Sequence, residues 1–198
     1  MSVRPTILAV CTGNICRSPA VELLLRARLG GQVDVASAGV GALVGAPVSP
    51  PMADLLEQAG IGTQGFAARQ LTRDLVREAS LVLALTRRHR SAVVRLEPAA
   101  LRRTFTLREL ARLLALADRD GLPVDPAERL AGVIARAQAA RAAAGAVLPA
   151  ERADEDDVVD PWRGDDALYA RSWAQLAPAA EVVASVLAPS TAPRAAHR

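Results

Sequence analysis

The segment CTGNICRS places a thiol, a guanidinium and a hydroxyl group close together, between Cys11 and Ser18. A cysteine thiolate is a strong nucleophile, and the planar fork of an arginine matches two oxygens of a phosphoryl group. Ser18 can donate a hydrogen bond to the sulfur. These residue types predict nucleophilic attack by Cys11 on a phosphorus atom whose oxygens are held by Arg17.

The flanking segments indicate how these residues are positioned. Residues 5–10 form a short apolar run that favours a buried strand, and residues 19–30 have helical periodicity. A loop between a strand and the N-terminus of a helix turns backbone N–H groups inward and lies at the positive end of the helix dipole. Gly13 and Asn14 tolerate the left-handed backbone that such a loop needs. We therefore expect a phosphate site in which Cys11 is a thiolate.

Other phosphate-binding loops fit this segment poorly. A Walker A loop requires a lysine, and the chain has no lysine at any position. The glycine pattern of dinucleotide-binding folds is also absent from the segment. Cys11 and Cys16 are too few for a disulfide framework and lack partner ligands for a zinc site. We expect neither a metal nor an organic cofactor.

Strand-like and helix-like segments alternate along the chain. Further strands are expected at residues 33–40, 81–86 and 103–107, and further helices at 51–59, from 88, at 108–117 and at 165–187. The alternation predicts an α/β fold: one three-layer domain over residues 1–188, with a four-stranded parallel sheet and helices on both faces. Open sheets of this kind bind ligands at the carboxyl ends of their strands, where residues 11–18 would lie.

Residues 118–157 interrupt this alternation. They contain the turn-rich stretch DRDGLPVDP, an alanine-rich helical stretch at 127–144 and an acidic run at 154–157. We interpret the whole as a helical insertion and the acidic run as solvated surface. Residues 189–198 are polar and broken by proline, so we expect a disordered tail.

The composition argues against several classes of partner. Of the 198 residues, 51% are hydrophobic and 3% aromatic, so the chain can bury a core built mainly from Leu, Val and Ala. The formal net charge is +3, yet no platform of aromatic and basic side chains indicates nucleic acid as a partner. No apolar run is long enough for a spanning helix and no leader opens the chain, so we expect a cytoplasmic protein without a membrane partner.

The segment CTGNICRSP resembles the signature loop of the low-molecular-weight protein tyrosine phosphatases, which has the pattern C-x5-R-[ST]. The resemblance covers about residues 5–117 and 158–187. It implies that Cys11 is the nucleophile, Arg17 the phosphate clamp, Ser18 a stabiliser of the thiolate and Asn14 the internal brace of the loop. It also implies a reversible disulfide between the nucleophile and Cys16. The loop residues expected to bind substrate are Thr12, Gly13, Asn14, Ile15, Cys16 and Ser18.

This family takes its general acid from a loop with the pattern D-P-aromatic, which here falls on VDPWRG and therefore on Asp160. Chemistry requires an acid independently, because the leaving oxygen needs a proton that a thiolate cannot supply. Trp162 is then a wall against which a flat substrate ring stacks, or else a core aromatic. The rival carboxylates are Asp156, Asp157, Asp165 and Asp166.

Two positions depart from the family pattern. Phe66 stands where the motif H-x-A-R-x-L has its histidine, which puts in doubt the support that this histidine gives to the phosphate loop. Arg163 stands where a second aromatic often follows the first. It either favours anionic surroundings in the substrate or is a solvated surface arginine.

Together these features predict hydrolysis of a phosphomonoester through a cysteinyl-phosphate. The expected substrates are phosphotyrosine proteins, with a bacterial tyrosine kinase or its target as partner. An arsenate reductase of the same fold is an alternative, but it would need an external thiol because no cysteine follows Cys16. A protein arginine phosphatase is similar again, but its loop has Thr where this chain has Ile15, which cannot hydrogen-bond a phosphoguanidinium. A phosphate-binding adaptor would need neither Cys11 nor Asp160.

Overall fold

The computed structural model describes residues 4–116, 120–143 and 154–188. Its strands are β1 (Thr6–Cys11), β2 (Asp34–Gly39), β3 (Leu81–Ala84) and β4 (Thr104–Thr106). Its α-helices are α1 (Arg17–Leu29), α2 (Pro50–Gln58), α3 (Arg73–Glu78), α4 (Arg87–Leu96), α5 (Leu107–Leu116), α6 (Pro126–Ala143) and α7 (Asp166–Leu187). Each strand and helix expected from the sequence is present, with bounds shifted by a few residues at most.

The four strands form one parallel sheet in the order β2-β1-β3-β4. β1 lies inside the sheet, and its residues Ile7, Leu8, Ala9 and Val10 are at most 1% exposed. A strand covered by helices on both faces needs apolar side chains on both faces, which explains its continuous apolar run. Parallel strands end at one edge of the sheet, so the predicted α/β architecture brings the loop after β1 next to the end of β2.

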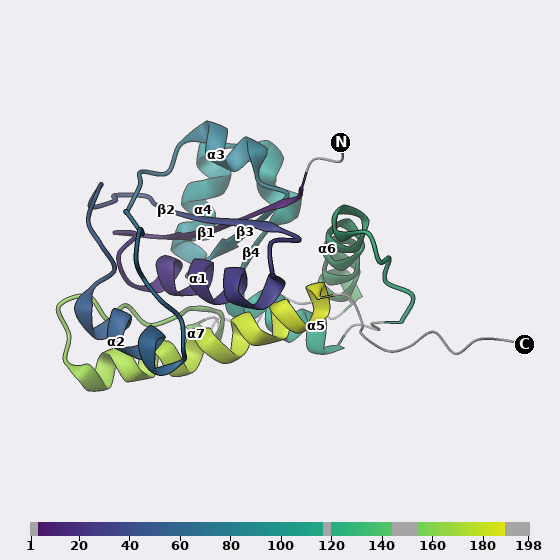
Figure 1. Cartoon of the computed structure of the whole chain (residues 1–198). Coiled ribbons are helices and arrows are strands. Elements are labelled where there is room, and N and C mark those ends of the chain that lie inside the picture. The colour runs from purple at the N-terminus through teal and green to yellow at the C-terminus, as the bar shows by residue number, and fades with distance from the viewer. Residues whose placement is uncertain (1–3, 117–119, 144–153, 189–198) are drawn as a thin grey trace, which may run out of the picture.

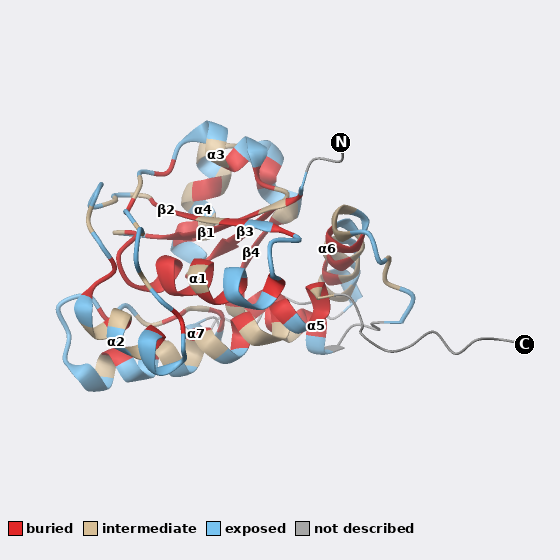
Figure 2. Ribbon diagram, in the orientation of Figure 1, coloured by how far each residue is buried: buried red, intermediate tan, exposed pale blue. Residues whose placement is uncertain are grey.

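Helices cover both faces of the sheet, as Figure 1 shows. One core joins α1, α2, α5 and α7 to the face that presents Ile7 and Leu83. A smaller core on the opposite face joins α3 and α4 to Leu8 and Val82. Buried residues accordingly follow the strands and the sheet-facing sides of the helices (Figure 2). No helix in the described ranges is long and apolar enough to cross a membrane.

Two short elements were not predicted. α3 and the 3₁₀ helix at Pro98–Arg103 each contain six residues, which is too few to display a clear hydrophobic period. The start of α3 is nevertheless marked chemically, because the hydroxyl of Thr72 accepts a hydrogen bond from the N–H of Leu75 at 3.3 Å. A search for N-cap residues, rather than for periodicity, would have found this helix.

The acidic run Asp154–Asp157 is not simply solvated surface, contrary to expectation. Asp156 is 8% exposed, and its carboxylate pairs with Arg112 of α5 at 3.2 Å. The carboxylate of Asp157 accepts a hydrogen bond from the N–H of Arg87, the first residue of α4, at 2.7 Å. The expectation failed because the arginines that face the run lie more than forty residues away in sequence. The run anchors the start of the loop that contains VDPW.

The expected insertion contains the expected helix, α6. α6 packs against α5 and α7, beyond one end of the sheet (Figure 1). Its Arg129 donates a hydrogen bond to the carbonyl of Val186 in α7 at 2.8 Å, and its Arg141 stacks over Phe105 at 4.2 Å. The remaining parts of the predicted insertion, at 118–119 and 144–153, and the predicted tail at 189–198 lie outside the described residues.

We predict that Gly39→Ala disrupts the loop after β1. A Cβ at Gly39 would lie 2.4 Å from the carbonyl oxygen of Thr12 and 3.0 Å from the N atom of Asn14, and neither backbone atom can give way cheaply. The expected result is a loss of about 1–3 kcal/mol in the free energy of unfolding, measured in urea, together with reduced turnover of an aryl phosphate. Gly41→Ala is the control, because a Cβ there meets nothing within 4 Å. Equal destabilisation by both substitutions would contradict the prediction.

Candidate active site

A pocket of about 200 Å³ opens at the carboxyl end of the sheet. Its walls come from the loop after β1, the segment after β2 and the loop before α7. The residues that line it are Cys11, Thr12, Gly13, Ile15, Cys16, Arg17, Gly41, Leu43, Asp160, Trp162 and Arg163. Asn14 and Ser18 are fully buried behind this lining. The structure therefore gathers at one place every residue that the sequence analysis proposed for the site.

The loop formed by residues 11–17 keeps its carbonyl groups outside the pocket. The carbonyls of Cys11, Thr12, Gly13 and Ile15 accept hydrogen bonds of 2.7–3.0 Å from the N–H groups of Val40, Gly41, Leu43 and Ser49. In a planar trans peptide the carbonyl and the following N–H point in opposite directions. The N–H groups of residues 12–14 and 16 consequently face away from these partners. They form an anion cradle at the N-terminus of α1.

Asn14 is the internal brace of the loop. Its backbone has a φ of 54°, the left-handed conformation that asparagine tolerates better than most residues. Its side-chain amide donates to the hydroxyls of Ser18 at 2.9 Å and Ser37 at 2.7 Å, and its side-chain carbonyl accepts from the N–H of Arg69 at 2.8 Å. The side chain of Asn14 therefore holds the loop from behind, and both of its polar side-chain atoms have partners.

The thiol of Cys11 is coupled to this brace through Ser18. The two side chains lie 2.9 Å apart, from the sulfur to the hydroxyl oxygen. Because the hydroxyl of Ser18 already accepts a hydrogen bond from Asn14, its own proton is free to point at the sulfur. Cys11 is 2% exposed, so this donor acts in a site where little water competes.

Glu22 of α1 completes the support behind the loop. Its carboxylate accepts a hydrogen bond from the hydroxyl of Ser37 and pairs with Arg26 at 2.7 Å. Burial raises the pKa of Glu22, and the hydrogen bond from Ser37 and the charge of Arg26 act in the opposite direction. Phe66, where the family motif has histidine, packs against the apolar core instead. The loop is thus supported through Ser37 and Glu22, which sequence analysis did not single out.

Arg17 faces the pocket from the first position of α1. Its guanidinium pairs with the carboxylate of Asp160 at 2.6 Å and donates to the carbonyl of Val158 at 3.3 Å. The side chain is 4% exposed, and its Nε has no hydrogen-bond partner among the described residues. A buried guanidinium with an unused N–H on the wall of an anion cradle is suited to hold phosphoryl oxygens.

Asp160 is the only carboxylate among the described residues that lines the pocket. Its side chain is 51% exposed, so water can reach it. One carboxylate oxygen accepts a hydrogen bond from the N–H of Trp162 at 3.2 Å, which helps to orient it within the rigid Asp-Pro turn. The four rival carboxylates do not line the pocket; they are Asp156, Asp157, Asp165 and Asp166. Asp165, for example, caps α7 by accepting from the N–H of Leu168 at 2.9 Å.

Trp162 and Arg163 form the outer wall of the pocket. Trp162 is 47% exposed, so it is not a core aromatic. The guanidinium of Arg163 lies over its ring at 5.8 Å, within the range of a cation–π contact. Arg163 has a φ of 64°, an unusual backbone conformation for a non-glycine residue. The wall combines a flat apolar surface with a positive charge.

Cys16 lies on the pocket wall but is held from behind by the C-terminal helix. Its sulfur is 3.7 Å from the hydroxyl of Tyr169 in α7, and that hydroxyl is 2.8 Å from the hydroxyl of Ser49. Burial raises the pKa of the Cys16 thiol, hydrogen bonding to Tyr169 and Ser49 offsets part of this rise, and the nearby Cys11 adds to it. Cys16 is thus suited to remain a protonated thiol at neutral pH. Tyr169 was not anticipated, because it lies far from the loop in sequence.

His89, in the first turn of α4, is the second site residue that sequence analysis missed. It is 4% exposed; its Nε2 lies 2.9 Å from the hydroxyl oxygen of Thr12, and its Nδ1 lies 3.0 Å from that of Thr86. Burial lowers its pKa to about 4, Arg17 and Arg88 add to the effect, and Asp160 offsets part of it. The available signal was the spacing Thr86-x-x-His89 directly after a buried strand.

The geometry of this pocket agrees with what the chain resembles. A family model described as low molecular weight phosphotyrosine protein phosphatase matches residues 6–122. The chain belongs to this family. The protein-tyrosine-phosphatase Etp of Escherichia coli K12 is 38% identical over 132 residues, which cover 67% of this chain and 88% of Etp. The protein is accordingly a hydrolase of the low-molecular-weight protein-tyrosine-phosphatase family.

Solved structures extend the likeness over almost the whole phosphatase. The arginine phosphatase YwlE of Geobacillus stearothermophilus superposes with a TM-score of 0.67 at 26% identity, covering 92% of each chain. The tyrosine phosphatase Wzb of Escherichia coli K30, solved with sulphate, superposes with a TM-score of 0.65 at 25% identity, covering 93% of this chain and 99% of Wzb. The match to the family model ends at residue 122. The assignment of Asp160 to the site therefore rests on the geometry of the pocket. Within the described residues, no cluster of histidine, cysteine and acidic side chains is arranged to hold a metal ion.

The lowered pKa of His89 predicts a specific dependence of stability on pH. An unfolded histidine takes up a proton below a pH of about 6.5, whereas His89 in the folded phosphatase does so only near its pKa of about 4. Between these values the unfolded state binds more protons, so this contribution to stability falls by about 3 kcal/mol as the pH decreases. Urea unfolding of the wild type and of His89→Gln, repeated from pH 7 to pH 4, measures this contribution. The difference between their free energies of unfolding should change with pH by this amount. Parallel curves would contradict the prediction.

Proposed function

We propose that this phosphatase acts on phosphotyrosine side chains of proteins with Cys11 as nucleophile, Arg17 as phosphate clamp and Asp160 as general acid and base. The observation that carries these roles is the ion pair of 2.6 Å between Arg17 and Asp160. It brings Arg17 into contact with Asp160, the one carboxylate among the described residues that lines the pocket, and Cys11 lines the same pocket.

The first half-reaction transfers the phosphoryl group to the enzyme. The thiolate of Cys11 attacks phosphorus in line, and an S–P bond forms as the P–O bond to the tyrosine ring breaks. The loop N–H groups and Arg17 stabilise the charge on the equatorial oxygens. The phosphoryl oxygens take the place of the Asp160 carboxylate on Arg17, and Asp160, which then carries a proton, gives it to the leaving phenolate oxygen.

The second half-reaction restores the enzyme. Asp160, now a carboxylate, removes a proton from a water molecule that attacks the cysteinyl-phosphate. The S–P bond breaks, inorganic phosphate leaves, and the thiolate of Cys11 returns to the hydrogen bond of Ser18. The half-exposed position of Asp160 supports this step, because the attacking water must come from solvent.

The walls of the pocket support an aryl phosphate as substrate. Trp162 offers a flat face for a phenyl ring, and Ile15 lines the pocket with an apolar side chain. Arg163 adds a positive charge that suits acidic residues next to the phosphotyrosine. We propose a bacterial tyrosine kinase or its target as the protein partner, the cytoplasm as the location and no cofactor.

The likeness to an arginine phosphatase makes phosphoarginine the alternative substrate. Ile15 argues against phosphoarginine as the substrate, because its side chain on the pocket wall cannot hydrogen-bond a phosphoguanidinium. A parallel assay with a phosphotyrosine peptide, a phosphoarginine peptide and arsenate plus glutathione separates the three activities. We expect turnover of phosphotyrosine above all, and a gain on phosphoarginine in Ile15→Thr. Cys11→Ser should be inactive on every substrate yet still bind phosphate. A wild type that prefers phosphoarginine or arsenate would overturn the assignment.

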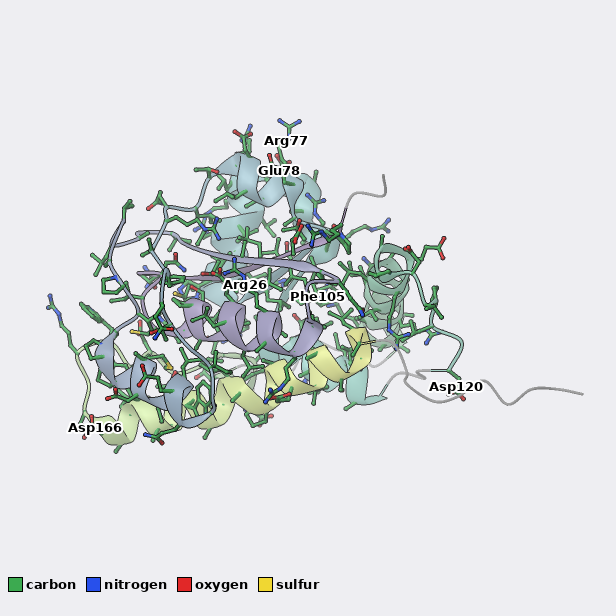
Figure 3. All side chains as sticks on the ribbon, viewed as in Figure 1. Arg26, Arg77, Glu78, Phe105, Asp120 and Asp166 are labelled. Atoms are coloured by element: carbon green, nitrogen blue, oxygen red, sulfur yellow. The ribbon has the colours of Figure 1, made fainter. Side chains whose placement is uncertain are left out.

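The role of Asp160 predicts a dependence on the leaving group. Asp160→Asn should lose roughly 10²–10⁴-fold in kcat on phosphotyrosine, because the tyrosine phenolate leaves poorly without a proton. The loss on an aryl phosphate with a strongly acidic phenol should be clearly smaller. Asp166→Asn is the control, since Asp166 lies at the outer end of α7 (Figure 3). Equal losses of Asp160→Asn on both substrates would contradict the acid role.

The second loop cysteine predicts a reversible response to peroxide. Peroxide oxidises Cys11 to a sulfenic acid, and attack by the Cys16 sulfur releases water and forms a disulfide. Dithiothreitol should restore the wild type but not Cys16→Ala, in which the sulfenic acid oxidises further. Activity after peroxide and reductant, with the disulfide followed by mass spectrometry, measures this. Full recovery of Cys16→Ala would leave Cys16 a packing residue beneath Tyr169.

A further inference from the structure

His89 belongs to no step of the proposed reaction, yet its ring joins the start of α4 to the pocket wall. Nδ1 lies 3.0 Å from the hydroxyl oxygen of Thr86 and Nε2 lies 2.9 Å from that of Thr12. Thr12 is exposed and lines the pocket together with Asp160. The ring therefore connects an element outside the site to a residue on the wall of the pocket.

Two tautomers of a neutral imidazole are compatible with these distances, and two observations select one of them. The first concerns Thr86. Its hydroxyl oxygen, as the N-cap of α4, already accepts the backbone N–H of His89 at 3.2 Å. If its proton points at Nδ1, both the donor and the acceptor capacity of this hydroxyl are used. In the other tautomer that proton has no partner among the described residues.

The second observation concerns the helix dipole. α4 has ten residues, and its positive N-terminal end lies beside Nδ1. An unprotonated Nδ1, with its lone pair toward that end, is favoured over a protonated one. Burial and the guanidinium of Arg17 already keep the ring neutral by lowering its pKa to about 4. The neutral form with the proton on Nε2 therefore fits its surroundings.

This tautomer has a consequence for the pocket. A proton on Nε2 makes His89 the donor to the hydroxyl oxygen of Thr12. The hydroxyl proton of Thr12 is then free, and because Thr12 is exposed and lines the pocket, this proton can turn toward a bound phosphoryl group. This polarity suits a phosphoryl dianion, whereas the opposite polarity would turn lone pairs of Thr12 toward it.

We propose that His89 is a positioning residue that, through its Nε2–H, directs the hydroxyl proton of Thr12 toward a phosphoryl oxygen of the substrate. Thr12 thereby adds a side-chain donor to the backbone cradle, and Thr86 holds the tautomer. The inference rests on the proposed function of the pocket, but it assigns roles to residues that the reaction scheme leaves unused.

The tautomer can be measured directly in the intact phosphatase. The chain contains two histidines, so His197→Gln leaves His89 as the only imidazole. In ¹⁵N-labelled protein at pH 7, long-range ¹H–¹⁵N correlations should show a protonated Nε2 and an unprotonated Nδ1. A protonated Nδ1, whether in the other tautomer or in a charged ring, would overturn the proposal.

Kinetics then test the coupling between the two side chains. Thr12→Val and His89→Leu should each lower kcat/KM on phosphotyrosine about 10-fold, as for loss of one hydrogen bond to a charged group. The double variant should lose no more than either single variant, because His89 acts only through Thr12. Thr12→Ser and His89→Gln, which keep a hydroxyl and a donor, should remain within about 3-fold of the wild type. A multiplicative loss of about 100-fold in the double variant would show independent roles and overturn the proposal.

Binding of inorganic phosphate separates positioning from folding. Thr12→Val should weaken competitive inhibition by phosphate about 10-fold, since the lost donor contacts the phosphoryl group itself. Thr86→Val should also weaken the inhibition by phosphate. The control is Thr72→Val, which removes the N-cap of α3 and should destabilise the fold to a similar degree without changing the inhibition. If Thr72→Val and Thr86→Val behave alike, Thr86 acts through stability alone and its part in the proposal fails. Because Cys11→Ser and Asp160→Asn test the reaction scheme independently, either result can fail without the other.

Discussion

The phosphatase site depends on the hydrogen bonds that the side-chain amide of Asn14 makes. The backbone of Asn14 adopts the left-handed conformation at the centre of the loop, and the three hydrogen bonds of its side chain reach α1, β2 and the segment after α2. A loop with N–H groups directed at one point has no secondary structure of its own to hold it. Its shape must be imposed from behind, and Asn14 does so from a fully buried position. The orientation of Ser18 toward the sulfur of Cys11 follows from the same contact.

Local chemistry was sufficient to predict the fold and most of the loop. The apolar run before Cys11 and the periodic segment after Pro19 identify strand and helix, and the alternation of such segments identifies a parallel sheet. Once the sheet is parallel, the carboxyl edge is the place for Cys11 and Arg17. Asp160 was proposed because the stretch DPW matches the acid-loop pattern of the family, and because an Asp-Pro dipeptide is rigid enough to hold a carboxylate in place. In each case the information lies within a few neighbouring residues.

Long-range partners were beyond that kind of inference. Ser37, Tyr169 and His89 reach the loop from β2, α7 and α4, separated from their partners by 23, 153 and 77 positions. A serine in a strand or a tyrosine in an amphipathic helix has many ordinary explanations. The expectation that Asp156 is solvated was wrong for the same reason. A run of carboxylates is usually solvated unless arginines from elsewhere in the fold face it. Such pairings become visible only when the elements are placed in space.

The half-exposed ring of Trp162 has a practical consequence for the phosphatase. The chain contains two tryptophans, and the second, Trp173 in α7, packs against the core. An indole on the wall of the pocket, beneath the guanidinium of Arg163, changes its emission when an aryl group displaces water from its face. An indole packed in the core contributes a steady background. The molecule thus carries its own optical reporter, and occupancy of the pocket is readable from intrinsic fluorescence without a label.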